Sequence, residues 1–149
     1  MDFSKFDTVA AAEAGAAMPV KHPGNDEPME WEGVPITWTL RGSDSESFQT
    51  AVDQSIEKNT SKSKKRGGGI LGITRADQKN DLISYIVACN VAWSDGFGKM
   101  AAQILQLDGE FPCTAANARA ILTRVPWLRE QANAWIGNRA NFLPEPETP

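Results

Sequence analysis

The residues with the clearest chemical potential form the segment KSKKRGGGILGI, residues 62–73, in which a basic run enters three glycines and then an apolar stretch. A phosphate-binding loop needs a glycine, four further residues and then Gly-Lys-Ser/Thr, and it follows a buried strand. Here the basic residues come before Gly67–Gly69, and a helical pattern precedes them. We therefore interpret these glycines as a joint between two helices and expect no phosphate site.

Other side chains that commonly catalyse reactions or bind metals are few and scattered. The single histidine, His22, stands beside Pro23 in a turn-rich segment, where a surface or packing role is expected. Cys89 falls in an apolar helical stretch and is expected to be a small buried hydrophobic residue. Cys113 precedes a predicted helix N-terminus, a position that can lower a thiol pKa. Since no second histidine is available, the sequence predicts no enzyme, no catalytic residue, no metal site and no cofactor.

Charge is unevenly distributed along the chain. The 149 residues carry a formal net charge of −4, which does not favour a dedicated nucleic-acid binder. Within residues 57–66 five basic residues face one acid, a local charge of +4, so the remaining chain carries −8. This asymmetry suits a basic element that meets an acidic partner, although solvated lysines near a helix end are the plainer interpretation. The candidate partner-binding residues of this run are Lys62, Lys64, Lys65 and Arg66.

The overall composition is that of a soluble globular domain, with 41% hydrophobic and 23% charged residues. No apolar run reaches the length of about 18 residues that a membrane span needs. The N-terminal residues lack the basic start of a signal peptide. A reducing cytoplasm is the expected location.

The five tryptophans fall into two groups. Trp93, Trp127 and Trp135 fall on apolar helix faces and are expected in the core. Trp31 and Trp38 fall in a predicted hairpin that is too small to bury both. These two are therefore candidates for a partner-binding surface.

The N-terminal part of the chain is predicted to hold a short helix and a small β-hairpin. An alanine-rich stretch, residues 3–14, is closed by Gly15, a residue type common at helix C-termini. Prolines and glycines over residues 23–28 predict a turn. A strand follows, with apolar residues alternating at Val34, Ile36, Trp38 and Leu40.

Residues 43–66 are predicted to form a basic helix that projects in part. The sequence SDSE places Ser43 three residues before Glu46, the spacing of a capping box. Beyond Ile56 no apolar residue appears until Ile70. Because the second half of this helix has no apolar face to pack, it is expected to project or fray.

Residues 74–143 are predicted to be the helical core. Thr74 starts a helix that is apolar nearly all round as far as Trp93, and Thr114 and Pro126 begin two further helices. The acidic, proline-rich residues 144–149 are expected to be unstructured. The sequence thus predicts a mainly α single domain over residues 1–143, with the N-terminal hairpin as its minor β part.

Five stretches follow one another in an order that is informative. They are VAAAEAGAAMPVKHPGNDEPM, ITWTLRGSDSESFQTA, a basic helix, ACNVAWSDG and LDGEFPCTAANARAILTRVPWLREQANAWIGNRANFL. In this order the chain resembles the tail assembly chaperones of long-tailed, siphovirus-like bacteriophages over nearly its whole length. The most specific parts are residues 42–45, Trp93, residues 112–117 and residues 138–143, whereas KRGGGILGI departs from the pattern.

The resemblance implies a non-enzymatic assembly factor. Such proteins coat the long, helical, aggregation-prone tape-measure protein in the host cell cytoplasm until tail tube subunits polymerise around it. Many are made in two lengths by ribosomal frameshifting. The expected partners are thus the tape-measure protein, the tube subunit and further copies of this chain, with apolar client helices held in a groove.

Two other functions stay open at this point. One is a structural virion component, such as a tail-completion, tail-tip or neck protein, which would be present in the finished virion tail. The other is a small nucleic-acid-binding regulator that uses residues 58–66, and salt-dependent DNA binding would identify it.

Overall fold

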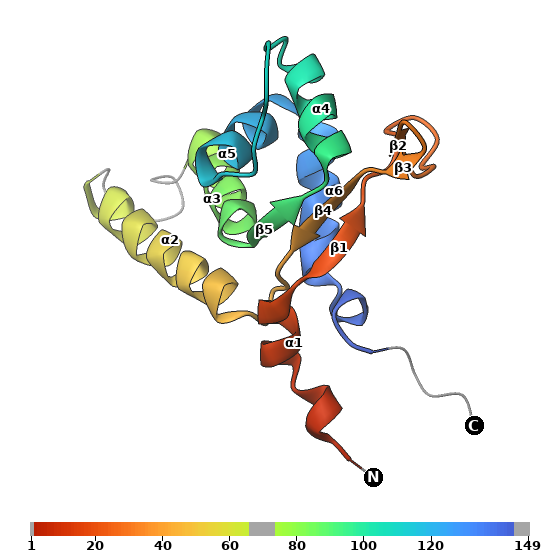
Figure 1. Cartoon of the computed structure of the whole chain (residues 1–149). Helices are drawn as coiled ribbons and strands as arrows, with labels where there is room; N and C mark the ends of the chain where they lie inside the picture. The colour runs from red at the N-terminus through yellow and green to blue at the C-terminus, as the bar shows by residue number, and fades with distance from the viewer. Residues whose placement is uncertain (1, 66–73, 145–149) are drawn as a thin grey trace.

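The computed structural model of the chain describes residues 2–65 and 74–144, apart from the side chains of Ser63 and Lys65. Arg66, the predicted joint Gly67–Gly69 and residues 145–149 of the predicted tail lie outside the described residues. Helices predominate and antiparallel strands form two small units, so the fold is mainly helical α+β (Figure 1). The strands are more extensive than the single predicted hairpin.

The N-terminal helix is divided in two. A 3-10 turn, η1 (Ser4–Phe6), precedes α1 (Thr8–Ala14), and the Asp7 carboxylate accepts a hydrogen bond from the Ala10 amide at 3.1 Å. Asp7 therefore caps α1 and separates it from the first turn. The predicted helix over residues 3–14 is confirmed in its C-terminal half, where Gly15 ends it.

The main sheet has three antiparallel strands in the order β1–β4–β5, namely β1 (Ala16–Pro19), β4 (Thr37–Leu40) and β5 (Asn90–Trp93). The register pairs Met18 with Trp38 and Trp38 with Trp93, which places these three side chains in one row. The predicted hairpin is thus present as β1 and β4. The third strand of the sheet, β5, comes from a segment predicted to be helical.

Between β1 and β4 the chain forms a small lobe, residues 21–35, which we call the acidic lobe after Asp26, Glu27, Glu30 and Glu32. It contains a second hairpin of β2 (Glu30–Trp31) and β3 (Val34–Pro35). Its two connecting residues, Glu32 and Gly33, both have positive φ, at 50° and 81°. Two such residues make the type I′ turn that suits strand twist, and glycine at the second position adopts it without strain.

The predicted core helix ends five residues before Trp93. The helix α3 (Arg75–Ala88) begins at Thr74 with the reciprocal capping by Asp77 that characterises a capping box. Cys89 closes α3, and residues 90–93 leave it to form β5. The prediction of one continuous helix is wrong here because pairing with β4 outweighs the local helical pattern. A further helix, α4 (Asp95–Ile104), follows at once and was not predicted.

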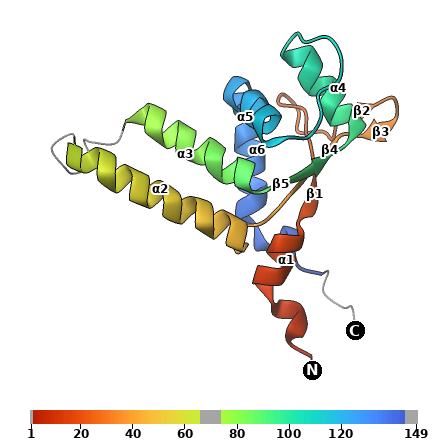
Figure 2. The same cartoon turned by 60° about the vertical axis from the view of Figure 1, so that its left-hand side comes forward.

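The basic helix α2 (Glu46–Lys65) runs antiparallel to α3, and Figure 2 shows the two lying side by side and extending away from the body. The predicted cap at Ser43 is wrong, because Ser45 Oγ accepts the hydrogen bond from the Phe48 amide at 3.1 Å. The second half of α2 projects as predicted, but it remains helical as far as Lys65.

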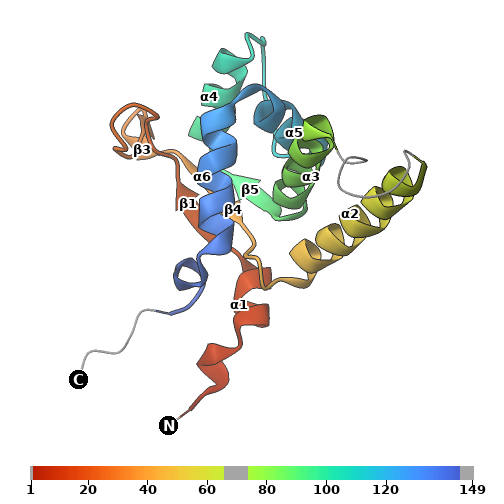
Figure 3. The ribbon, with the colours of Figure 1, turned by 180° about the vertical axis from the view of Figure 1, so that it is seen from behind.

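The last two helices are α5 (Ala115–Arg124) and α6 (Pro126–Gly137), followed by the turn η3 (Arg139–Asn141). Both predicted starts are confirmed, since Thr114 caps α5 and Pro126 opens α6. α6 lies behind the sheet in Figure 1 and in front of it in Figure 3, so it covers one sheet face. The core is formed by buried side chains of the main sheet and of α3, α4, α5 and α6. It contains Met18, Trp38, Leu40, Ile83, Ile86, Phe97, Ile121, Leu122, Leu128 and Ile136. None of the described helices is both long and apolar enough to cross a membrane.

Candidate functional site

The two tryptophans predicted to face a partner occupy different environments. Trp38 has no exposed surface, and its Nε1 donates a hydrogen bond to Asn90 Oδ1 at 2.8 Å. The prediction that Trp38 faces a partner is therefore wrong, because β5 and α4 add the aromatic neighbours Trp93 and Phe97 that a lone hairpin lacks. Trp31 is half-buried and packs against α4, so only part of its ring remains accessible.

The predicted basic run is not one uniform surface. Lys62 Nζ lies 2.7 Å from Asp77 Oδ1 on α3, so Lys62 joins two helices. One turn away, Asn59 donates a hydrogen bond to Asp81 at 2.8 Å, so polar contacts hold this part of α2 against α3. Lys64 is exposed. The Lys65 side chain and Arg66 lie outside the described part of the chain.

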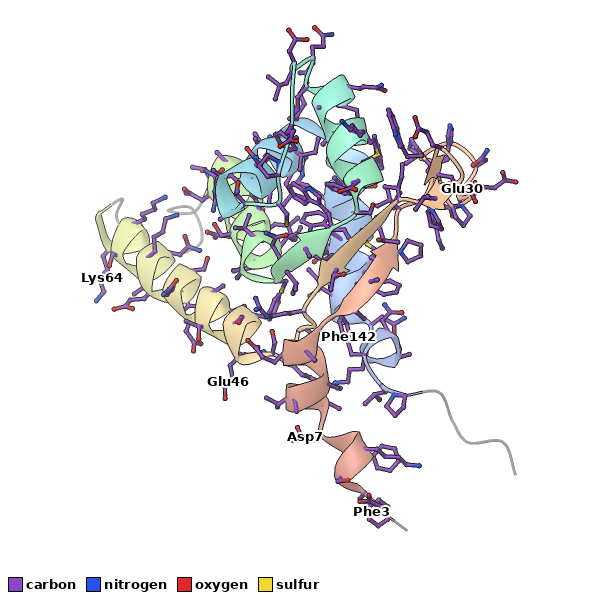
Figure 4. The ribbon with its side chains drawn as sticks, viewed as in Figure 1. Phe3, Asp7, Glu30, Glu46, Lys64 and Phe142 are labelled. Atoms are coloured by element: carbon purple, nitrogen blue, oxygen red, sulfur yellow. The ribbon has the colours of Figure 1, made fainter. Side chains whose placement is uncertain are left out.

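The structure therefore does not bring the six predicted partner-binding residues together. Figure 4 shows Lys64 at the far end of α2 and Glu30, the neighbour of Trp31, at the opposite side of the molecule. Trp38 is buried in the core. A single site made of the aromatic and basic residues is not present among the described residues.

A cleft of about 390 Å³ opens beside α4 and the loop that precedes α5. Its walls include the ring of Trp93, which stacks parallel to Phe111 with centroids 5.8 Å apart, and the thiol of Cys113. Cys113 Sγ donates to Asn90 Oδ1 at 3.1 Å, and burial raises the pKa of this thiol. From its position just before a helix, Cys113 was a candidate for a lowered thiol pKa. The pKa is raised instead, because the thiol is partly buried.

The remaining candidates for chemistry have structural roles. Cys89 is fully buried, as predicted, and burial raises the pKa of its thiol to about 12. His22 Nδ1 accepts a hydrogen bond from the Gly24 amide at 2.9 Å, which stabilises the turn. Within the part of the chain that the structure describes, no three His, Cys, Asp or Glu side chains are grouped to hold a metal ion.

An exposed apolar surface lies at the N-terminus, on what we call the apolar arm, formed by Phe3, Phe6 and Val9. Their exposed fractions are 65%, 54% and 46%. Phe3 and Phe6 are one 3-10 turn apart, and their ring centroids are 6.0 Å from each other. Figure 4 shows Phe3 at the tip of this segment, pointing away from the body. The arm thus presents a short apolar strip to solvent.

The apolar arm is firmly attached at its other end. Ala12 is buried, and its carbonyl accepts a hydrogen bond from the Gly42 amide at 3.0 Å. Glu13 accepts a hydrogen bond from Ser47 Oγ at 2.6 Å and lies 3.4 Å from the Arg41 guanidinium. The bond from Ser47 lowers the pKa of Glu13. The arm therefore has a fixed base and an exposed tip.

A second accessible surface is the sheet face opposite α6. One row across it consists of Ala17, Thr39 and Ala92, of which the two alanines are exposed. The bulge in β5 adds Val91, which is 41% exposed. These side chains are small, so this face is flat and weakly apolar.

Comparisons of the chain with protein-family models, curated proteins and solved structures find no match. The candidate binding surfaces therefore follow from the chain's own residues alone. Sequence reasoning did not single out Phe3, Phe6 and Val9, although their regular spacing of three was visible. The sequence predicted a short helix over residues 3–14 and assigned none of its faces to the core or to solvent.

Proposed function

We propose that this protein is a bacteriophage tail assembly chaperone, a non-enzymatic protein of the host cell cytoplasm. In this function it binds the tape-measure protein and keeps it soluble until tail tube subunits assemble around it. The observation that carries the proposal is the apolar arm, whose two phenylalanines lie exposed on a well-anchored base. The resemblance of the chain's sequence segments, in their order, to such chaperones is a second, independent argument for it.

Exposure of the arm has a thermodynamic consequence. Burying a phenylalanine side chain contributes roughly 1.5–3 kcal/mol, so a partner that covers Phe3 and Phe6 gains a substantial binding free energy. The strip is short and regularly spaced, which suits the apolar face of a client helix. The flat face around Ala17 and Ala92 offers a second, weaker contact. Many copies along one extended client would add such contacts together.

Co-expression with the tape-measure gene tests this function. The soluble fraction of the tape-measure protein is compared in cells with and without this chain, and purified particles are analysed by mass spectrometry. The proposal predicts a higher soluble fraction with the chain present, and particles that lack it. An unchanged soluble fraction together with a fixed copy number in mature particles would instead establish a structural virion component.

A further inference from the structure

The distal end of the α2–α3 pair carries exposed cations that we call the basic tip. Lys58 and Lys64 belong to α2, whereas Arg75 and Lys79, one helical turn apart, share one face of α3. Among the described residues none of these four side chains forms an ion pair. Lys62, in contrast, is already neutralised within the helix pair. The basic tip therefore holds uncompensated positive charge.

The acidic lobe carries negative charge, and its carboxylates likewise form no ion pair among the described residues. Asp26, Glu27, Glu30 and Glu32 are all exposed. Against them residues 21–35 contain one lysine, Lys21, which leaves a local charge of −3. Glu30 on β2 and Glu32 in the turn that follows it are only two residues apart. Like charges held this close repel each other, and an approaching cationic surface relieves that repulsion.

These two surfaces lie at opposite ends of the molecule. The far end of α2 and the β2–β3 hairpin stand apart in Figures 1, 2 and 3, and Figure 4 labels Lys64 and Glu30 on opposite sides. They therefore cannot meet within one chain. We propose that the chain self-associates head to tail, with the basic tip of one copy against the acidic lobe of the next.

The proposed contact joins two different surfaces, so each copy keeps one free tip or one free lobe for a further copy. Such an interface builds open chains, or rings where the rotation closes, rather than a closed two-fold dimer. Charge complementarity singles out a second copy as the occupant of both surfaces. The contact uses neither the apolar arm nor a client, so it stands independently of the proposed chaperone function.

Sedimentation of the purified full-length chain measures this association directly. At low salt the average mass is expected to rise continuously with concentration, without a plateau at twice the monomer mass of 16.2 kDa. At about 0.5 M salt, where the Debye length falls to roughly 4 Å, the protein is expected to sediment as a monomer. The same buffers are used to titrate a labelled short DNA duplex, which is the competing occupant of the basic tip.

A charge-swap experiment locates the two surfaces. The tip variant carries Lys58→Glu and Lys79→Glu, and the lobe variant carries Glu30→Lys and Glu32→Lys. Each variant alone is expected to self-associate about tenfold or more weakly, because like charges then face each other. Mixed together, the two variants pair an acidic tip with a basic lobe, and association is expected to return to within about threefold of wild type.

The matched control carries Lys99→Glu and Arg124→Glu, two exposed positions outside both surfaces, with the same change in net charge as the tip variant. This control is expected to associate like the wild type. Association that survives high salt, a mass that stops at the dimer, or variants that do not rescue each other would overturn the proposal. A wild-type chain that stays monomeric while the tip binds DNA would also overturn it and assign the tip to nucleic acid.

Discussion

The side chain of Trp31 lies against α4 because residue 96 is a glycine. A Cβ atom at position 96 would be 2.7 Å from Trp31 Cβ and 3.3 Å from Ile36 Cγ1. This close approach brings the acidic lobe onto the body and explains why Trp31 is only half-exposed. Trp38, two strands further along the chain on β4, is completely buried.

Gly96→Ala is therefore expected to destabilise the protein by about 1–3 kcal/mol, the usual cost of forcing extra volume into a packed contact. Gly137→Ala is the matched control, since a Cβ there would meet no atom within 4 Å. It is expected to leave stability unchanged or to raise it by about 0.5–1 kcal/mol. Urea unfolding followed by circular dichroism measures both, and an equal effect of the two substitutions would contradict the packing of Trp31 on α4.

An ion pair between Asp44 and Arg139 makes stability depend on pH. Asp44 accepts two hydrogen bonds from Arg139, at 2.6 and 2.9 Å, and these lower the pKa of Asp44 below its ordinary 3.8. Because the folded protein binds this proton less readily than the unfolded chain, the contribution is present above about pH 4 and is lost as pH falls below it.

The free energy of unfolding is therefore expected to fall as the pH is lowered below about 4. Asp44→Asn should lower stability at neutral pH and make that pH dependence shallower. Some dependence remains from Glu13, whose pKa is also lowered by a hydrogen bond from Ser47. Asp108→Asn, at an exposed position, is the matched control. A pH profile of Asp44→Asn identical to wild type would show that the Arg139 contact does not form in solution.

At the scale of elements, the α2–α3 pair shows how the outer half of α2, which has no apolar stripe, is held. The Phe48 ring contacts Tyr85 near the base of the pair, with centroids 5.7 Å apart. Further out, the contacts of Asn59 and Lys62 with buried carboxylates on α3 replace hydrophobic packing. This polar interface lets the pair extend from the body without fraying in its described residues.

Lys62→Gln is accordingly expected to destabilise the protein by about 1–3 kcal/mol, because it removes the cation beside a buried carboxylate. Lys64→Gln, two residues further along α2, should change stability by less than about 0.5 kcal/mol since its side chain is exposed. Urea unfolding compares the two variants. If both were neutral, the pair would be held by its apolar base alone.

Several element boundaries were predictable because their signals are local. Thr74, Thr114 and Pro126 start helices through contacts within the first turn, and the sequence shows such contacts directly. β5 was missed since its strand conformation depends on pairing with β4, some 50 residues earlier in the chain, as the Trp38–Asn90 hydrogen bond illustrates. α4 was missed because two glycines, at positions 96 and 98, weaken its helical pattern while both are buried against neighbouring backbone or side chains.

The candidate surfaces were less predictable than the elements. Whether Trp38 or Phe3 is exposed depends on which segments pack over it, and that is a property of the whole fold. The sequence correctly indicated a basic segment in an acidic chain. It did not reveal that Lys62 is used internally, because its partner Asp77 lies on the next helix.

At the scale of the whole molecule, four regions are separated in space: a core of helices on one sheet face, the apolar arm, the basic tip and the acidic lobe. The core explains stability, and the charged ends account for the proposed self-association. The arm contributes little to the core because Phe3, Phe6 and Val9 are largely exposed. Exposing these apolar side chains to water is unfavourable, and a client that covers them would remove that exposure.

The most direct test of this account is the affinity of the purified protein for a soluble tape-measure fragment, measured by titration calorimetry with an arm variant, Phe3→Ala and Phe6→Ala. We expect unchanged folding but binding weakened about 100-fold or more, as the loss of two buried phenylalanines implies. A control with Val34→Ala and Leu107→Ala, which are 60% and 51% exposed elsewhere, should bind like the wild type. Equal affinity of the arm variant and the wild type would contradict the arm as the client-binding surface.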